Sequence, residues 1–190
     1  MECLFSCENC NLCNNQKPLL DKQSFSDILW VGLSAKKVDC IETSIPLSND
    51  TNSGKIIESI EKEFNNLYFY KTNLVKCLPL DEKNKLRYPE KEEMEACFEN
   101  LIYEIKTLKP KIVFLLGNKV ANFVIKNLNN KKFLSSIPNS LKETINNITF
   151  ETVYHPSYIY VYKRKEKDIY IENIKLKISN FFSNQIQYAS

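Results

Sequence analysis

The sequence predicts an α/β fold in which helices cover both faces of a central four-stranded parallel sheet, a three-layer αβα arrangement. The main observation is that apolar runs of strand length alternate along the chain with segments whose apolar residues recur at helical spacing. The first of these runs is almost continuously apolar, as expected for a strand buried on both faces. In such folds ligands bind outside the carboxyl ends of the strands, so the residues that follow the strands are the first to inspect.

The first predicted strand covers residues 27–32, Asp-Ile-Leu-Trp-Val-Gly, and its closing glycine allows the next loop to approach a ligand. Residues 53–64 are a predicted helix with four apolar residues at helical spacing. Residues 67–75 return to the aromatic and β-branched pattern of a strand. The apolar residues of the helix are Ile56, Ile57, Ile60 and Phe64.

A longer helix is expected to start near Pro89 and to stop before Pro110. Its apolar face consists of Met94, Cys97, Leu101, Ile105 and Leu108. A strand at 111–116, a helix at 120–128, a strand at 148–154 and a helix at 168–182 complete the prediction. The last helix should point Ile171, Ile174, Ile178 and Phe181 inward.

The chain of 190 residues and 22.2 kDa fits a single domain over residues 1–190, with a cysteine-rich segment at its N-terminus. The formal net charge of +3 is too small to identify a partner. No apolar run reaches the length of about 18 residues that a membrane span needs. The first residues lack the apolar stretch of a secretory signal, so we expect the protein in the reducing cytoplasm. We also expect a monomer.

The cysteines predict a metal or iron–sulfur site. Cys7 and Cys10 are two residues apart, so both sulfurs can reach one centre from a single turn, and Cys77 and Cys97 supply a distant second pair. Four thiolates suit zinc or an iron–sulfur cluster. Cys3 and Cys13 are further candidates for the first pair, and simple buried or free cysteines are the alternative to any such site.

The loops expected after the strands contain two of the three glycines and the only histidine, a convergence that packing alone does not explain. They are Gly32-Leu33-Ser34-Ala35, Thr72-Asn73-Leu74, Gly117-Asn118 and His155-Pro156-Ser157. Directly afterwards Tyr158, Tyr160 and Tyr162 run into Lys163 and Arg164. This segment combines stacking surfaces with phosphate-seeking cations, and the alternative is an ordinary solvated loop.

Four segments occur in a characteristic order: Cys7-x-x-Cys10-x-Leu12, then Tyr70-Lys71-Thr72-Asn73-Leu74-Val75-Lys76-Cys77, then Ala96-Cys97, then Tyr154-His155-Pro156-Ser157. Together they resemble the uracil-DNA glycosylase superfamily, most closely its iron–sulfur family 4 type, over most of the chain. The resemblance implies a 4Fe–4S cluster, with zinc less favoured, on Cys7, Cys10, Cys77 and Cys97. Cys3 and Cys13 would then be bystanders. It also implies DNA as the partner, either single-stranded or carrying a deaminated base.

In enzymes of this family a base is flipped into a pocket and cut from deoxyribose. The resemblance implies that Asn73 reads the N3 hydrogen and O4 of uracil. It implies that His155 donates a hydrogen bond near O2, where negative charge grows as the glycosidic bond breaks. Tyr158 and Tyr160 would lie in a loop that presses into the DNA minor groove, beside Lys163 and Arg164. The alternatives are a turn residue for Asn73 and a structural histidine for His155.

The first-strand segment departs from the family 4 pattern Gly-Glu-Ala-Pro-Gly, since this chain has Gly32-Leu33-Ser34-Ala35-Lys36. The carboxylate that helps to place water is replaced by Leu33, as in the active family 5, and Ser34 is left to position water. Leu47 stands where the family has an aromatic ring that stacks on the base. Leu33 and Leu47 would therefore line a diverged pocket.

The sequence thus predicts a uracil-DNA glycosylase-like protein that binds DNA and excises uracil or another deaminated base by hydrolysis of the N-glycosidic bond. The alternative is a catalytically inactive member of the family that binds DNA or a protein. A zinc-bound structural module is a third interpretation, but it leaves Asn73 and His155 unexplained.

Overall fold

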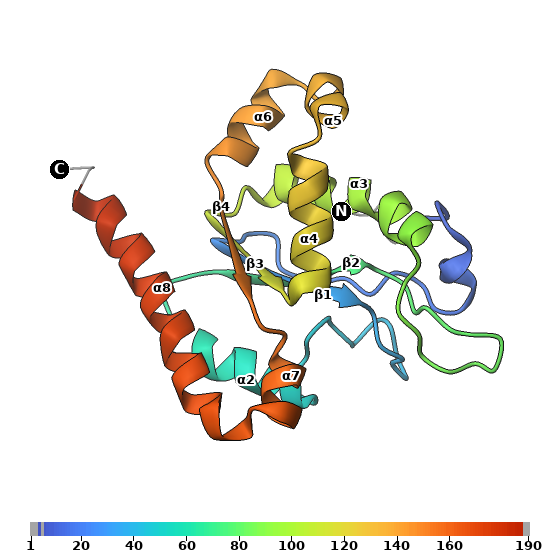
Figure 1. Ribbon diagram of the computed structural model, residues 1–190, viewed down its shortest axis with the longest axis horizontal. Helices are drawn as coiled ribbons and strands as arrows, with labels where there is room; N and C mark the ends of the chain where they lie inside the picture. Colours follow the sequence, from blue (N-terminus) through green and yellow to red (C-terminus); the bar gives the residue numbers. More distant parts are fainter. Residues whose placement is uncertain (1–3, 5, 188–190) are drawn as a thin grey trace. The chain divides into compact units, whose positions relative to one another are not determined.

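The computed structural model describes residue 4 and residues 6–187. The chain forms two compact units (Figure 1). Unit 1 contains the chain up to Pro46 together with Leu67–Val153, and unit 2 contains Leu47–Asn66 together with the chain after Val153. The single domain over residues 1–190 stays a prediction. Within the described residues, no helix combines the length and the apolar character needed to cross a membrane.

Unit 1 is built on a four-stranded parallel sheet with the strand order β2-β1-β3-β4 (Figure 1). The strands are β1 (Ile28–Ser34), β2 (Phe69–Val75), β3 (Ile112–Leu116) and β4 (Thr149–Val153). The predicted α/β class and the four-stranded parallel sheet are confirmed. Leu33 and Ser34, expected in a loop, instead belong to a strand, because β1 runs two residues past Gly32. Asn73 lies inside β2, which ends at Val75 as the predicted strand does.

Four α-helices and a short 3-10 helix accompany the sheet in the described part of unit 1: η1 (Asn11–Asn14), α3 (Lys91–Leu108), α4 (Asn118–Leu128), α5 (Lys131–Ser136) and α6 (Asn139–Asn146). One core cluster joins residues of α3, α4 and α6 to one face of the sheet, which presents Leu29, Val31, Tyr70, Val113 and Leu115. On the opposite face Trp30 stacks on Phe114 at 4.6 Å between ring centroids, and both rings are at most 1% exposed. Burial of both faces agrees with the predicted three-layer arrangement.

The charged segment between Cys77 and Cys97 is a folded turn that leads into α3. Asp81 accepts the backbone N–H groups of Lys83 and Lys85, at 2.9 and 2.8 Å. Arg87 then pairs with the carboxylate of Glu93, which also accepts the N–H of Glu90 at 2.7 Å and so satisfies a free donor at the helix start.

Unit 2 consists, in its described part, of α2 (Asn52–Glu61), α7 (Pro156–Tyr162), η2 (Arg164–Glu166) and α8 (Lys167–Gln187). α2 packs against α7 and α8. Most of the apolar residues predicted to face inward from α2 and α8 are buried, namely Ile56, Ile57, Ile60, Ile171, Ile174 and Ile178. Phe64 lies beyond the end of α2, and it and Phe181 are only half-buried. The predicted loop around Tyr158 and Tyr160 is wrong: these residues form α7, which Pro156 can start because a proline at the first helical position loses no hydrogen bond.

Gly54 allows the segment that precedes α2 to fold back onto the first turn of that helix. Thr51 Oγ1 accepts the N–H of Gly54 at 2.9 Å and donates to the carbonyl of Ser48 at 2.8 Å. A Cβ on Gly54 would lie 1.9 Å from the Ser48 oxygen and 2.5 Å from the Leu47 oxygen. Leu47 itself has a φ of 51°, a left-handed conformation that a leucine adopts only under such constraint.

We expect Gly54→Ala to lower the free energy of unfolding by about 2 kcal/mol or more, since the added methyl group would collide with backbone atoms. This loss would appear although alanine is intrinsically the better helix former by about 1 kcal/mol. Urea unfolding measures it, with the neighbouring exposed Lys55→Ala as the matched control, expected within about 0.5 kcal/mol of the parent. A Gly54→Ala variant as stable as the parent would contradict this close contact.

Candidate active site and cysteine centre

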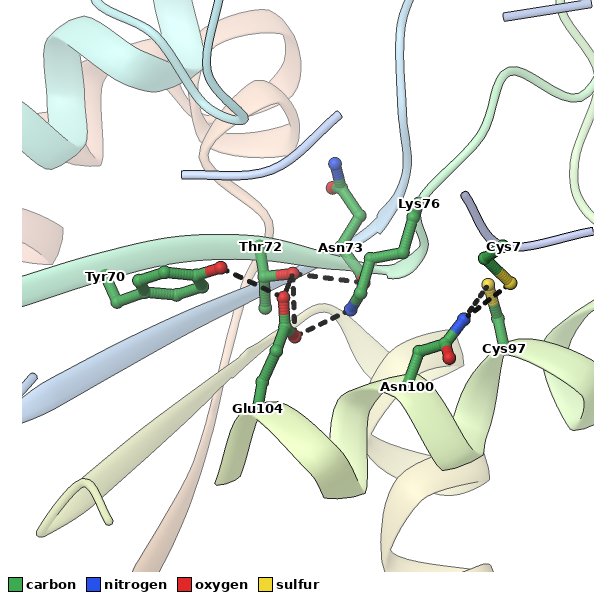
Figure 2. Close-up of polar contacts among 8 residues, drawn as sticks. All are labelled: Cys7, Tyr70, Thr72, Asn73, Lys76, Cys97, Asn100 and Glu104. Atoms are coloured by element: carbon green, nitrogen blue, oxygen red, sulfur yellow. Dashed lines mark hydrogen bonds and ion pairs between the residues drawn. The ribbon is translucent and has the colours of Figure 1, made fainter. Parts of the chain in front are cut away.

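In unit 1 the side chain of Asn73 lies at the carboxyl end of β2 and is 5% exposed. Its register partner on β1 is Gly32, and a Cβ at that position would lie 2.3 Å from Asn73 Oδ1. Only a glycine leaves room for the amide of Asn73 there. Figure 2 shows this amide extending to the side of β2 opposite the carboxylate of Glu104.

Ser34 and Leu33, the last two residues of β1, are half-buried beside this end of β2. Successive side chains of a strand point to opposite faces, so Ser34 shares the face of Gly32 and Asn73. Leu33 points the other way and packs against the core cluster on the α3 side. Ser34 therefore lies with Asn73, whereas Leu33 supports the strand from behind.

A buried ion pair anchors the backbone of Asn73. Lys76 Nζ lies 2.7 Å from Glu104 Oε2 and donates to the backbone carbonyl of Asn73 at 2.6 Å (Figure 2). Thr72 Oγ1 lies 3.0 Å from both carboxylate oxygens, and the Tyr70 hydroxyl donates to Oε1 at 3.2 Å. The side chains of Lys76 and Glu104 are only 1% and 0% exposed. A charge removed from water in this way is stable only because each of its polar atoms is paired.

Burial raises the pKa of the Glu104 carboxyl, whereas the Lys76 ammonium and the hydrogen bonds from Lys76, Thr72 and Tyr70 act in the opposite direction. Burial and the same carboxylate raise the pKa of the Tyr70 hydroxyl, which therefore stays protonated and serves as a donor. The group is thus a carboxylate held by one cation and two hydroxyl groups.

The predicted cysteines gather in unit 1. Cys77 follows β2, Cys97 lies on α3, and together with Val75 and Leu12 of η1 they form a small buried cluster against which Cys10 and Cys13 pack. The amide of Asn100 on α3 donates to Cys7 Sγ at 3.2 Å and lies 3.9 Å from Cys97 Sγ (Figure 2). Cys3 lies outside the described residues.

Burial raises the pKa of the Cys77 thiol, and the neighbouring thiols raise it further. Thiols that meet in a buried place are the soft donors that iron–sulfur clusters and zinc require, so the donor set fits such a group. Within the described part of the chain, however, no three His, Cys, Asp or Glu side chains already have the arrangement of a metal site.

In unit 2 His155 caps the start of α7 with its own ring. The N–H of Ser157 donates to His155 Nδ1 at 3.1 Å, and Ser157 Oγ lies 2.7 Å from the same nitrogen. A ring nitrogen that accepts an N–H carries no proton, so the hydrogen of the neutral ring is assigned to Nε2. Burial lowers the pKa of His155, which also favours the neutral form. The ring therefore presents Nε2–H as a hydrogen-bond donor.

The other predicted residues of unit 2 are Leu47, in the segment before α2, Tyr158 and Tyr160 on α7, Lys163 directly after that helix, and Arg164, the first residue of η2. Tyr158 is exposed on α7, whereas Tyr160 is half-buried with the Arg164 guanidinium 5.4 Å from its ring centroid. Lys163 pairs with Glu166 at 2.9 Å.

Sequence reasoning missed Lys76, Glu104 and Asn100. A signal was available for the first two, because Lys76 interrupts the apolar run Leu74-Val75-Lys76-Cys77-Leu78 and Glu104 lies next to Ile105 on the apolar side of its helix. Opposite charges in two segments that should be buried indicate a pair. Nothing in the sequence marks Asn100 in this way.

The structure is a parallel α/β sheet with an asparagine near the end of β2 and a histidine that caps the helix after β4, an arrangement that agrees with the order of the sequence motifs. The family model described as the Uracil DNA glycosylase superfamily matches residues 18–177, and the chain belongs to this superfamily.

A curated relative, the Type-4 uracil-DNA glycosylase of Saccharolobus solfataricus, is 27% identical over 130 residues, 66% of this chain and 57% of that protein. The chain thus spans less than two thirds of the length of this relative. The crystal structure of wild-type SMUG2 from Pedobacter heparinus is also similar, with a TM-score of 0.59 and 18% identity over 84% of this chain and 77% of that chain. This likeness confirms the predicted fold.

We expect Lys76→Met to destabilise the protein by about 3 to 5 kcal/mol at neutral pH, because it leaves Glu104 as an unpaired buried carboxyl. Without Lys76 the pKa of Glu104 in the folded protein rises further above its ordinary value of 4.5. Between these two values the folded state holds a proton that the unfolded state has lost. The loss is therefore smallest below about pH 4.5 and grows as the pH rises through the raised pKa.

Urea unfolding at about pH 5 and about pH 8 tests this dependence. The double variant Lys76→Met/Glu104→Leu removes both charges, so it should recover most of the stability and lose the pH dependence that Glu104 causes. If Lys76→Met alone is as stable as the parent at the higher pH, the ion pair does not have the role assigned to it.

Proposed function

We propose that this protein binds DNA and excises uracil or another deaminated base by hydrolysis of the N-glycosidic bond. The observation that carries the proposal is the amide of Asn73, which is buried at the end of β2, accommodated by Gly32 and anchored through its backbone by Lys76. A surface turn residue needs neither the missing Cβ nor the ion pair. Such preorganisation is what a group that reads a base requires.

The Asn73 side chain would identify the base. Its Oδ1 would accept the N3 hydrogen of uracil while its Nδ2 donates to O4, a pattern that cytosine does not present. Because a base inside a duplex cannot reach such a buried amide, the base would have to leave the stack.

The His155 ring would stabilise the leaving base. As the bond between C1′ and N1 of the base breaks, its electron pair moves onto the base and negative charge collects at O2. His155 Nε2–H would donate a hydrogen bond to that oxygen, and the Ser157 contacts at Nδ1 would keep the hydrogen on Nε2. Water then forms the new bond to C1′ and loses a proton to the solvent, and the departing base anion takes up a proton from the solvent, which leaves an abasic sugar and the free base.

Further roles follow from the positions of the remaining residues. Ser34, on the face of Asn73, would position the attacking water, and Leu47 would offer the base an aliphatic contact. Leu33, which packs on the core side of β1, would support the strand behind Ser34. Tyr158, Tyr160, Lys163 and Arg164 would contact the DNA strand.

We also propose that Cys7, Cys10, Cys77 and Cys97 hold a 4Fe–4S cluster with a structural role. The support comes from the gathering of the buried Cys77 and Cys97 with the half-buried Cys7 and Cys10, and from the similarity to the Type-4 relative. The cluster would cross-link the N-terminal segment, the end of β2 and α3. The side-chain amide of Asn100 would donate hydrogen bonds to the sulfurs of Cys7 and Cys97.

Leu33 and Leu47 favour a second candidate function, a catalytically inactive base- or DNA-binding protein on the same scaffold. Leucine can neither activate water as a carboxylate does nor stack as an aromatic ring does. The excision experiment below separates the two functions.

We expect the parent protein, in excess over a labelled uracil-containing strand, to produce an abasic site in a single turnover. Asn73→Ala and His155→Ala should each reduce the rate about a hundredfold or more, since each removes a preorganised hydrogen bond to the reacting base. The exposed Asn146→Ala in unit 1 is the matched control and should retain the parent rate. Activity that survives His155→Ala would contradict its role, and DNA binding by a parent without product would favour the inactive protein.

After purification without oxygen, we expect the parent to contain iron and inorganic sulfide, and Cys77→Ser and Cys97→Ser to lose both. Cys13→Ser and the exposed Cys40→Ser should retain them, and they serve as matched controls. Elemental analysis and the visible absorption band measure the outcome. Loss in Cys13→Ser with retention in Cys10→Ser would show that the ligand set is a different one.

A further inference from the structure

Three exposed tyrosines form a continuous row along α7 in unit 2. Tyr154 precedes the helix, and Tyr158 and Tyr162 follow at intervals of four residues, so they share one side of it. The ring centroids of Tyr154 and Tyr158 are 5.3 Å apart, with an interplanar angle of 27°, and those of Tyr158 and Tyr162 are also 5.3 Å apart, with an angle of 38°. Their exposures of 53%, 40% and 74% place the row at the surface.

The row is fixed at its first residue. The buried Tyr170 on α8 donates from its hydroxyl to the backbone carbonyl of Tyr154 at 2.7 Å, which holds the start of the row on the long helix. Tyr158 and Tyr162 are held by the helical backbone of α7 itself. The three rings therefore present an ordered surface, which lowers the entropy that a ligand must remove on binding.

Cations border the row. Lys163 Nζ lies 5.7 Å from the centroid of the Tyr154 ring, and the neighbouring Arg164 lies over Tyr160. The segment from Tyr154 to Asp168 contains four basic and two acidic side chains, so its charge is positive. Aromatic rings beside cations match the stacked bases and phosphates of an unpaired strand.

We propose that Tyr154, Tyr158 and Tyr162 form a stacking surface for the unpaired bases of single-stranded DNA, with Lys163 and Arg164 beside its phosphates. The inference deepens the DNA binding of the proposed function and rests on it. It adds that the strand is recognised through its bases, independently of any uracil, and it assigns Tyr154 and Tyr162, which the glycosylase reaction does not use. Paired bases cannot offer their faces to the row, so duplex DNA should bind more weakly.

Fluorescence anisotropy with a labelled thymidine oligonucleotide, free of uracil, tests the surface directly. The same backbone with abasic sugars in place of the nucleosides, and a duplex of matched length, are the comparison probes. We expect the thymidine strand to bind about tenfold or more tightly than either. Equal binding of the thymidine and abasic strands would overturn the proposal, because phosphate attraction alone would then explain the affinity.

Two sets of variants assign the effect to the row. Tyr158→Ala and Tyr162→Ala should each weaken binding of the thymidine strand about tenfold and leave binding of the abasic strand unchanged. Tyr158→Phe and Tyr162→Phe keep the ring and should bind as the parent does, which separates lost stacking from lost folding. The matched control is Tyr88→Ala in unit 1, an exposed tyrosine whose ring also carries a lysine ammonium, that of Lys119 at 3.8 Å.

Unchanged binding in the two alanine variants, or an equal loss in Tyr88→Ala, would overturn the assignment. The outcome does not depend on excision, because the probes contain no uracil. A protein that binds these strands through the row but releases no base would support the stacking surface while it contradicts the glycosylase activity.

Discussion

The buried ion pair between Lys76 and Glu104 is the interaction on which the centre of unit 1 depends. It joins the end of β2 to α3, and its lysine also holds the carbonyl of Asn73. Cys77 is the next residue after Lys76, and Cys97 lies seven residues, two helical turns, before Glu104 on α3. One pair therefore fixes the spacing of the strand and helix that carry both the candidate base reader and the second pair of cysteines. A hydrophobic pair of the same size would fill the space but would hold no carbonyl.

The two units position their candidate residues in different ways. Asn73 depends on contacts between residues far apart in the chain, since its support comes from Gly32 on β1 and Glu104 on α3. In unit 2 the contacts are local: His155 is oriented by Ser157, two residues away. Local contacts form with little loss of loop entropy, whereas the support of Asn73 exists only once the sheet and α3 have assembled.

The sequence was a good guide to regular, amphipathic elements and a poor one to short polar ones. The four strands and the helices α2, α3, α4 and α8 follow from apolar spacing, because each buries one face or both. α5 and α6 are short and rich in lysine, asparagine and serine, so their helical state depends on packing of a few residues such as Leu141 and Ile145. The sequence pattern does not predict α7, because Pro156 and Ile159 are its only buried residues and make no apolar stripe. The site residues could be named from their motif, but not the Glu104 network, which exists only through contacts between distant segments.

Unit 2 is assembled from two stretches of chain that are separated by most of unit 1. During synthesis α2 leaves the ribosome long before α7 and α8, and at about 5 to 20 residues per second the interval amounts to several seconds. Throughout that interval the isoleucines of α2 have none of their partners from α7 and α8. The nascent chain thus displays the apolar face of α2 until α7 and α8 have been made.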